Sequence, residues 1–166
     1  LLVILSKYNK LVKQKNSVKQ AQSGIDVYLN QRFDLIPNLV ECVKGYAKHE
    51  EQVLEKITQL RAKYSKSKDL KEAEKLNNGI NQIIAVAEQY PELKASEQFL
   101  NLQKSLSKME SQLQAARRIY NNEVTAYNTT INTVPTNIIA KMFNFKEAEL
   151  FTIEDYKKEN IQVDLG

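Results

Sequence analysis

Apolar side chains recur at steps of three and four residues along most of the chain between Tyr8 and Val134. This spacing places side chains on one face of an α-helix, whereas a strand alternates every second residue. The clearest stretch forms a seam with one polar member: Ile36, Leu39, Val43, Tyr46, Glu50, Val53, Ile57, Leu60 and Tyr64. The pattern predicts one long amphipathic helix here.

Three further stretches repeat the spacing, from Tyr8 to Tyr28, from Ala73 to Tyr90 and from Phe99 to Val134. The composition, with only four Gly and three Pro in 166 residues, also favours helices. Short polar connections between helices make neighbours antiparallel. We therefore predict an all-α fold, an elongated antiparallel four-helix bundle with a short extra C-terminal helix.

Helix ends are expected at particular residues. Asp34 is expected to be the N-cap of the second helix, with Pro37 in its first turn. The residues before Pro91 and Pro135 should end helices three and four, because proline disfavours the α conformation in the preceding residue. Residues 77–79, Asn-Asn-Gly, read locally as a turn, but the apolar spacing continues through them and predicts one helix.

Gly24 and Gly45 both fall inside predicted helices, where glycine costs roughly 1 kcal/mol relative to alanine. Close backbone approach of a neighbouring helix or simple tolerance would each explain them. Beyond Pro135, an apolar group is too large to leave in water and predicts that the short extra helix folds back: Ile138, Ile139, Met142, Phe143, Phe145 and Phe151. Residues 152–166 are interpreted as a tail.

Positive charge is concentrated at the start of the chain. Residues 1–25 contain five lysines and no acid: Lys7, Lys10, Lys13, Lys15 and Lys19. Of 24 basic residues, 19 therefore remain against 20 acidic ones, so the net charge of +4 arises at this end. A nucleic-acid surface would need a basic stripe on the bundle itself, and we expect no nucleic-acid partner.

The first five residues, Leu-Leu-Val-Ile-Leu, are uninterrupted apolar. A membrane-spanning helix needs about 20 such residues, so residues 1–6 are interpreted as the end of an N-terminal transmembrane helix, and residues 7–151 as the bundle domain. An ordinary buried helix start is the alternative. Lysines directly after an apolar segment favour the cytoplasmic side. We expect a single-pass protein of the cell membrane with a cytoplasmic bundle, or alternatively an extracytoplasmic one.

The residues needed for common catalytic centres are missing from the sequence. His49 is the only histidine, so neither an H-E-x-x-H zinc site nor a ferritin-like di-metal site can be built. The lone Cys42 is interpreted as a packing residue. Glu50 and Glu123 lie on or beside seams, the latter near Arg117 and Arg118, and weak pairing at the bundle edge is the simplest reading of both. We predict a non-catalytic protein without a metal or cofactor.

The dipeptide Tyr-Asn occurs three times, at residues 8–9, 120–121 and 127–128. The last two copies are seven residues apart and therefore share a helical face. One interpretation is that they form interhelical hydrogen bonds that fix the register between the first and last helices. The other is a polar groove that holds a peptide or a lipid headgroup.

Several segments resemble the LemA family closely. They are Y-N-K-L-V (8–12), I-D-V-Y-L-N-Q-R-F-D-L-I-P-N-L-V (25–40), V-K-G-Y-A-K-H-E (43–50), Y-P-E-L-K-A (90–95), F-L-N-L-Q-K-S-L (99–106), R-R-I-Y-N-N-E-V-T-A-Y-N (117–128) and V-P-T-N-I-I-A-K-M-F-N-F (134–145). They follow the family's order over most of the chain. The resemblance implies a bacterial protein with one N-terminal transmembrane helix, a short N-terminus outside and a soluble helical domain whose molecular activity is not established.

The resemblance also marks family-like positions as candidate interaction or structural residues. These are Tyr8, Asn9, Asp26, Arg32, Asp34, Pro37, Asn38, Arg117, Arg118, Tyr120, Asn121, Tyr127, Asn128 and Pro135. Two positions depart from the family pattern. Gln22 stands where tryptophan is frequent, which puts an aromatic contact there in doubt, and Asn144 stands where glycine is usual, which is mild because asparagine tolerates a left-handed turn.

The preferred functional hypothesis is a membrane-anchored interaction or scaffold module with an unidentified protein or lipid partner. One alternative is an accessory to a membrane hydrolase or peptide-processing system that uses the Arg117, Arg118 and Glu123 region. The other is a self-assembling structural coiled-coil protein, because exposed seams can pair between chains. The sequence leaves the oligomeric state open.

Overall fold

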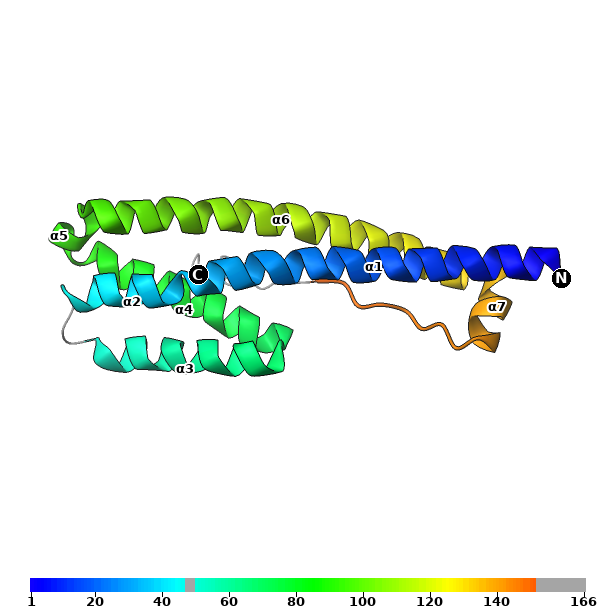
Figure 1. Cartoon of the computed structure of the whole chain (residues 1–166), viewed down its shortest axis with the longest axis horizontal. Helices are drawn as coiled ribbons and strands as arrows, with labels where there is room; N and C mark the ends of the chain where they lie inside the picture. Colours follow the sequence, from blue (N-terminus) through cyan, green and yellow to red (C-terminus); the bar gives the residue numbers. More distant parts are fainter. Residues whose placement is uncertain (47–49, 152–166) are drawn as a thin grey trace, which may run out of the picture. The chain divides into compact units, whose positions relative to one another are not determined.

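A computed structural model describes residues 1–46 and 50–151, and these contain seven helices and no strand (Figure 1). In chain order the helices are α1 (Leu2–Asp34), α2 (Ile36–Lys44), α3 (Glu51–Ser67), α4 (Leu70–Glu88), α5 (Pro91–Lys94), α6 (Glu97–Asn132) and α7 (Thr136–Met142). The predicted all-α helical-bundle fold is confirmed. His49 and the proposed tail at 152–166 lie outside the described residues.

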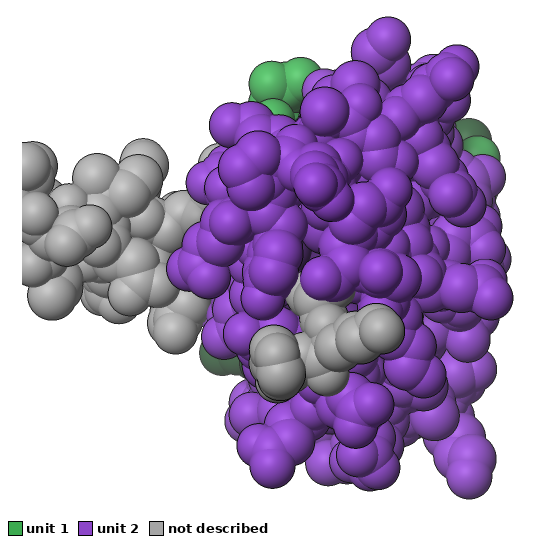
Figure 2. All heavy atoms as spheres, turned by 90° about the vertical axis from the view of Figure 1, so that its left-hand side faces the viewer, with its two compact units in different colours: residues 1–26, 113–166 green, residues 27–112 purple. Residues whose placement is uncertain are grey.

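The chain divides into two compact units (Figure 2). Unit 1 comprises residues 1–26 and 113–166, and unit 2 comprises residues 27–112. Helices α1 and α6 each contribute residues to both units. The domain boundaries inferred from the sequence, residues 1–6, 7–151 and 152–166, stay predictions.

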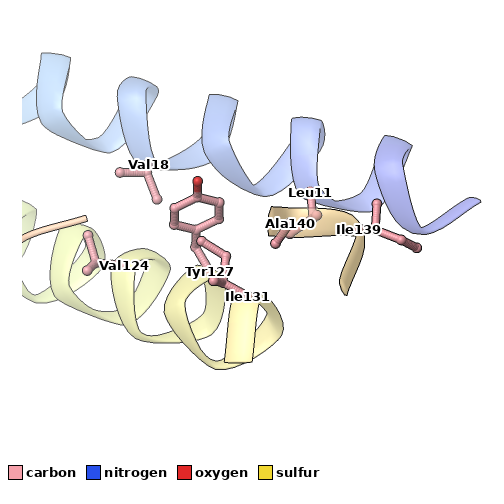
Figure 3. Packing of buried hydrophobic residues seen from close by; sticks show 7 residues of the cluster. All are labelled: Leu11, Val18, Val124, Tyr127, Ile131, Ile139 and Ala140. Carbon is pink, nitrogen blue, oxygen red and sulfur yellow. The ribbon is translucent and has the colours of Figure 1, made fainter. Parts of the chain in front are cut away.

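Unit 1 is built around a cluster of apolar side chains from three helices (Figure 3). Its buried members are Leu11 and Val18 of α1, Val124, Tyr127 and Ile131 of α6, and Ile139 and Ala140 of α7. The steps of seven, three and four residues between these positions on α1 and α6 are those of a helix face. The sequence spacing therefore predicted which sides of the two long helices pack together.

Unit 2 contains the rest of α1, helices α2 to α5 and the first part of α6. The ring of Phe33 on α1 meets that of Tyr64 on α3 edge-on, with 5.0 Å between ring centroids. Arg61 on α3 donates from Nε to the Phe33 carbonyl oxygen at 3.1 Å. The other side chains of unit 2 with the lowest exposure include Leu29, Ile36, Leu39, Ile57, Leu76, Ile80, Ile83, Leu93 and Phe99. All of these residues except Leu93 lie on the predicted seams of several helices or next to them.

The prediction of one long second helix was wrong, because the chain forms α2 and α3 with a break between them. Gly45 is the C-cap of α2, and the N–H of Tyr46 bonds the Val43 carbonyl in a tighter turn. Glu50, expected on the seam, is the N-cap of α3 in a non-helical conformation and is half-buried. Glycine has a low helix propensity, and here that local preference outweighs the continuing apolar spacing.

Helix ends near aspartate and proline follow the predictions only in part. Asp34 is not the N-cap of the second helix: it is the last residue of α1, Leu35 occupies the cap, and Pro37 lies in the first turn of α2 as expected. Helix α4 ends before Pro91 and α6 before Pro135, as predicted, although Pro91 also opens the short α5. Residues 77–79 continue α4 without a turn, which confirms that prediction.

Close helix approach occurs at Gly79 and not at Gly24 or Gly45, for which the sequence left close approach and simple tolerance open. A Cβ atom at Gly24 would meet nothing within 4 Å, and one at Gly45 would meet only a carbonyl oxygen at 3.7 Å. At Gly79 on α4, however, it would lie 2.9 Å from Cγ1 of Ile57 on α3. Glycine is therefore a packing requirement at Gly79, whereas at Gly24 it is tolerated.

Alanine at these two helical glycines should have opposite effects. Gly24→Ala should raise the free energy of unfolding by about 0.5–1 kcal/mol, because alanine restricts the unfolded chain and favours the helix. Gly79→Ala should lower it by about 1–2 kcal/mol, because the clash with Ile57 exceeds that gain. Urea denaturation followed by circular dichroism measures both. Equal stabilisation by the two changes would contradict the close approach of α3 and α4.

The apolar group after Pro135 is only partly buried. The short helix predicted there is present as α7, and Ile139 and Phe151 are buried. Ile138, Met142 and Phe143 are exposed, contrary to the expectation that the whole group would be withdrawn from water. Helix α7 therefore has one apolar face in the core of unit 1 and a second one at the surface.

Candidate functional site: a clasp on helix α6

The residues after α7 run back from this helix (Figure 1), and hydrogen bonds join them to α6. Asn144 has a positive φ of 57°, the left-handed conformation in which the chain turns after the helix. Glycine at this position in the family would adopt it at no steric cost, and asparagine serves the same purpose. The following residues, 145–151, form no helix or strand and are called segment 145–151 below.

Two asparagines of α6 bind the backbone of this segment through both polar atoms of their side chains. Asn128 donates from Nδ2 to the Ala148 carbonyl at 2.9 Å, and its Oδ1 accepts the Ala148 N–H at 2.9 Å. Asn121 makes the same pair with Phe151, at 3.3 and 2.9 Å. Each carboxamide thus makes the two backbone hydrogen bonds that a neighbouring strand would make with an extended residue in a sheet.

The spacing of the two pairs explains the sequence repeat. Residues 121 and 128 are seven apart on a helix, which is about 10.5 Å at 1.5 Å per residue. Residues 148 and 151 are three apart, which is about 10 Å in a nearly extended chain. Two asparagines seven residues apart on a helix therefore have the same spacing as two residues three apart in an extended segment. The extended segment runs antiparallel to α6.

Tyr120 adds a third contact, because its hydroxyl donates to the Glu149 carbonyl oxygen at 2.8 Å. Burial, and secondly the nearby Glu149 carboxylate, raise the pKa of this phenol above its usual value. The hydroxyl thus keeps the proton that it donates. Tyr120, Asn121 and Asn128 together are called the clasp.

Phe151 ends the described segment in a buried position beside Arg117 of α6. The Arg117 guanidinium carbon lies 5.4 Å from the centroid of the Phe151 ring, within the range of a cation–π contact. Both side chains are buried. The segment is thus fixed by its backbone at Ala148 and by its backbone and ring at Phe151.

The Tyr-Asn repeat therefore has a different role from the interhelical hydrogen bonds inferred from sequence. The asparagines of α6 bond to segment 145–151, and Tyr127 packs in the core with its ring directed towards α1 (Figure 3). Burial raises the pKa of Tyr127 as well. The other interpretation, a polar groove that holds a peptide, describes the geometry better, since a segment of the chain itself lies there.

The remaining copy, Tyr8-Asn9, lies on α1 and makes different contacts. The Tyr8 ring centroid is 4.8 Å from that of Phe143 and 5.8 Å from that of Phe145, and Asn9 is exposed. The Lys15 ammonium lies 5.6 Å from the Phe145 ring centroid. Tyr8 therefore joins the start of α1 to the residues on either side of Asn144.

The other candidate residues are distributed over both units. In unit 2, Arg32 is buried and forms an ion pair with Glu110, Asp34 pairs with Arg61 at 3.3 Å, and Pro37 and Asn38 are exposed on α2. In unit 1, Arg118 and Pro135 are exposed, and Asp26 and Glu123 are half-buried. Of the five N-terminal lysines, Lys7 is half-buried and Lys10, Lys13, Lys15 and Lys19 are exposed. The residues of the clasp and Arg117 converge on segment 145–151.

Sequence reasoning missed two partners of the candidate residues. Glu110 lies one residue from the seam position Met109 and gave no signal, although it pairs with Arg32. Segment 145–151 has no helical spacing and was noticed only for its phenylalanines. The repeat of asparagine at a heptad spacing was the signal that could have located the clasp.

The remaining groups that could bear chemistry are limited within the described part of the chain. No group of three or more His, Cys, Asp or Glu side chains that could hold a metal ion occurs among residues 1–46 and 50–151. Cys42 is buried; desolvation raises the pKa of its thiol, and a hydrogen bond with Ser96 opposes the rise. Over the same residues, no helix is long and apolar enough to cross a bilayer.

The fold and the clasp define a helical-bundle protein in which segment 145–151 is fastened to a long helix. The LemA family pattern matches residues 21–165, and the chain belongs to this family. It is 28% identical to Protein LemA of Metamycoplasma hominis over 164 residues, which covers 96% of this chain and 75% of that protein.

Magnetosome proteins are also similar to this chain. Magnetosome protein MamQ 2 of Paramagnetospirillum magneticum is 25% identical over 178 residues, and Magnetosome protein MamQ of Magnetospirillum gryphiswaldense is 23% identical over 184. Each alignment covers 89% of this chain and 65% of the relative. The chain thus spans slightly less than two thirds of these longer proteins.

Proposed function

We propose that this protein is a non-catalytic, membrane-anchored helical module that holds a protein or lipid partner at the bacterial cell membrane. The observation that carries the proposal is the exposed apolar run at residues 1–5 directly before an acid-free, lysine-rich stretch. Leu1 is 95% exposed, and the run decreases in exposure only to 42% at Ile4. So much apolar surface next to cations is typical of a segment that enters a lipid bilayer.

The charge distribution supports a site on the cytoplasmic face of the membrane. Lys7, Lys10 and Lys13 would lie about 3 to 12 Å beyond Leu5 at 1.5 Å per residue, within or near the headgroup layer. Anionic lipids of the cytoplasmic leaflet attract each such lysine by about 1 kcal/mol. A single-pass anchor that continues the apolar run is part of this proposal.

A structural rather than catalytic use of the polar residues agrees with their contacts. Tyr120, Asn121 and Asn128 are engaged with the backbone of segment 145–151, and Arg117 faces Phe151. These are the positions at which the sequence placed its candidate polar groove. Their contacts fasten one part of the chain to another, which suits a rigid module.

Vesicle flotation tests the proposal with two charge variants of the chain of residues 1–166. The first replaces Lys7, Lys10, Lys13, Lys15 and Lys19 with glutamine. The matched control replaces five exposed lysines of unit 2, Lys56, Lys66, Lys71, Lys104 and Lys108. The unchanged chain should float with vesicles of phosphatidylcholine that contain phosphatidylglycerol.

The N-terminal variant should bind these vesicles at least about 100-fold more weakly, because several contributions of about 1 kcal/mol are lost. The control variant should bind like the unchanged chain, and added salt should weaken both. No flotation of the unchanged chain, or equal losses in the two variants, would overturn the proposal.

A further inference from the structure

The exposed face of α7 consists of apolar side chains next to a surface rich in lysine. Ile138 and Met142 are four residues apart and share one side of the helix, and Phe143 follows directly. All three are at least half exposed, whereas Ile139 and Ala140 on the other side are buried in the core of unit 1. Packing in the core therefore explains why one face of α7 is apolar, but it does not explain the apolar residues on the exposed face.

This face lies at the same end of unit 1 as the apolar run of α1. The contact between the rings of Phe143 and Tyr8, 4.8 Å between centroids, fixes α7 beside α1 three residues after Leu5 (Figure 1). Three helical residues correspond to about 4.5 Å. If the run at 1–5 enters the hydrocarbon, Tyr8 and Phe143 lie in the headgroup layer, which is about 5–7 Å thick on each side.

Lysines outnumber acids in the sequence segments that border this face. Residues 1–25 contain five lysines and no acid, and residues 124–146 contain Lys141 and Lys146 and no acid. In the described part of unit 1, acids occur only at residues 26, 123, 147 and 149. An apolar face bordered by lysines complements an anionic lipid surface, in which apolar groups enter the interface and cations pair with phosphates.

We propose that the Ile138, Met142 and Phe143 face of α7 inserts into the headgroup region of an anionic bilayer, as a second membrane contact beside the N-terminal segment. This inference rests on the proposed membrane association, and it specifies which surface of unit 1 contacts the lipid. Interfacial helices bury their apolar faces at the boundary between headgroups and acyl chains, and a position about 4.5 Å beyond Leu5 lies within the headgroup layer. Tyr8 would then lie at the interface, where tyrosine is enriched, with the Phe143 ring against it.

The chain contains no tryptophan, so a single introduced one reports its surroundings without interference. Ile138→Trp places the reporter on α7, and Ile119→Trp provides a matched control on α6 of the same unit. The two isoleucines are equally exposed, at 58%. Met142→Trp is a second reporter in case the first perturbs α7, and circular dichroism establishes that each variant is folded.

Emission is recorded with vesicles of phosphatidylcholine, with and without phosphatidylglycerol, some carrying bromine on the acyl chains. Tryptophan at 138 should shift to shorter wavelength and be quenched by brominated lipid on the anionic vesicles, while tryptophan at 119 stays unchanged. Flotation without a shift at 138 or 142 would overturn this inference and leave the proposed membrane association intact. Absence of flotation would overturn both.

A loss-of-binding measurement gives the second readout. Ile138→Ser combined with Met142→Ser should weaken partition onto anionic vesicles roughly tenfold, because two apolar side chains no longer enter the interface. The control pair, Ile119→Ser with Leu100→Ser, should leave partition unchanged. Emission from position 138 that is already shifted without lipid and does not respond to it would mean that protein covers this face, which contradicts the proposal.

Discussion

Replacing Glu110 with glutamine should lower the free energy of unfolding by about 3 kcal/mol, because the change removes the charge opposite a buried guanidinium. Arg32 on α1 is 6% exposed, and the side chain of Glu110 on α6, which pairs with it, is 21% exposed. Loss of one partner of a buried pair typically costs 3–5 kcal/mol. The partial exposure of Glu110 lets water reach the site and places the expected loss at the lower end.

Urea denaturation followed by circular dichroism measures this loss, with Glu55→Gln as the control. Glu55 is exposed on α3 in the same unit, so that its substitution should change stability by less than about 0.5 kcal/mol. The double variant Arg32→Met with Glu110→Met should recover much of the stability that Glu110→Gln loses, because apolar side chains then replace both members of the buried ion pair. A single variant as stable as the control would mean that the Arg32 charge is satisfied elsewhere.

Helical spacing could predict the class of fold and most of the core. The seams through Leu11, Val18, Leu106 and Val124 are buried where the three-and-four pattern placed them. The break at Gly45 was missed because the apolar spacing continues across it, and a single low-propensity residue decides the local conformation there. Asp34 was also misplaced, because α1 extends through it, and its carboxylate pairs with Arg61 instead of capping a helix.

The candidate site was predictable in position but not in its contacts. The Tyr-Asn repeat pointed to Asn121 and Asn128 of α6, but these side chains bind segment 145–151 and not another helix. An extended segment fixed through its backbone leaves little trace in its own sequence, because main-chain groups are the same in every residue. Arg32 was singled out by resemblance alone, and its partner Glu110 required knowledge of which helices are adjacent.

Substituting alanine for both Asn121 and Asn128 should release segment 145–151 from α6. The change removes four hydrogen bonds between partly buried groups, each with a net contribution of about 1 kcal/mol. We expect the free energy of local opening to fall by about 3 kcal/mol, which accelerates hydrogen exchange of the Ala148 and Phe151 amides more than 100-fold. Global unfolding should change less, because the two substitutions leave the buried side chains of the core around Tyr127 in place.

Hydrogen exchange measured by NMR distinguishes this local opening from general destabilisation. Asn122→Ala is the matched control, because Asn122 is exposed between the two bonded positions and has no side-chain hydrogen bond within the described residues. Asn128→Asp distinguishes the two hydrogen bonds that Asn128 makes with Ala148. The carboxylate still accepts the Ala148 N–H but repels the Ala148 carbonyl oxygen. Exchange at Ala148 should then be intermediate, while the Phe151 amide keeps most of its protection. Unchanged protection of both amides in the double alanine variant would show that α6 does not fasten the segment.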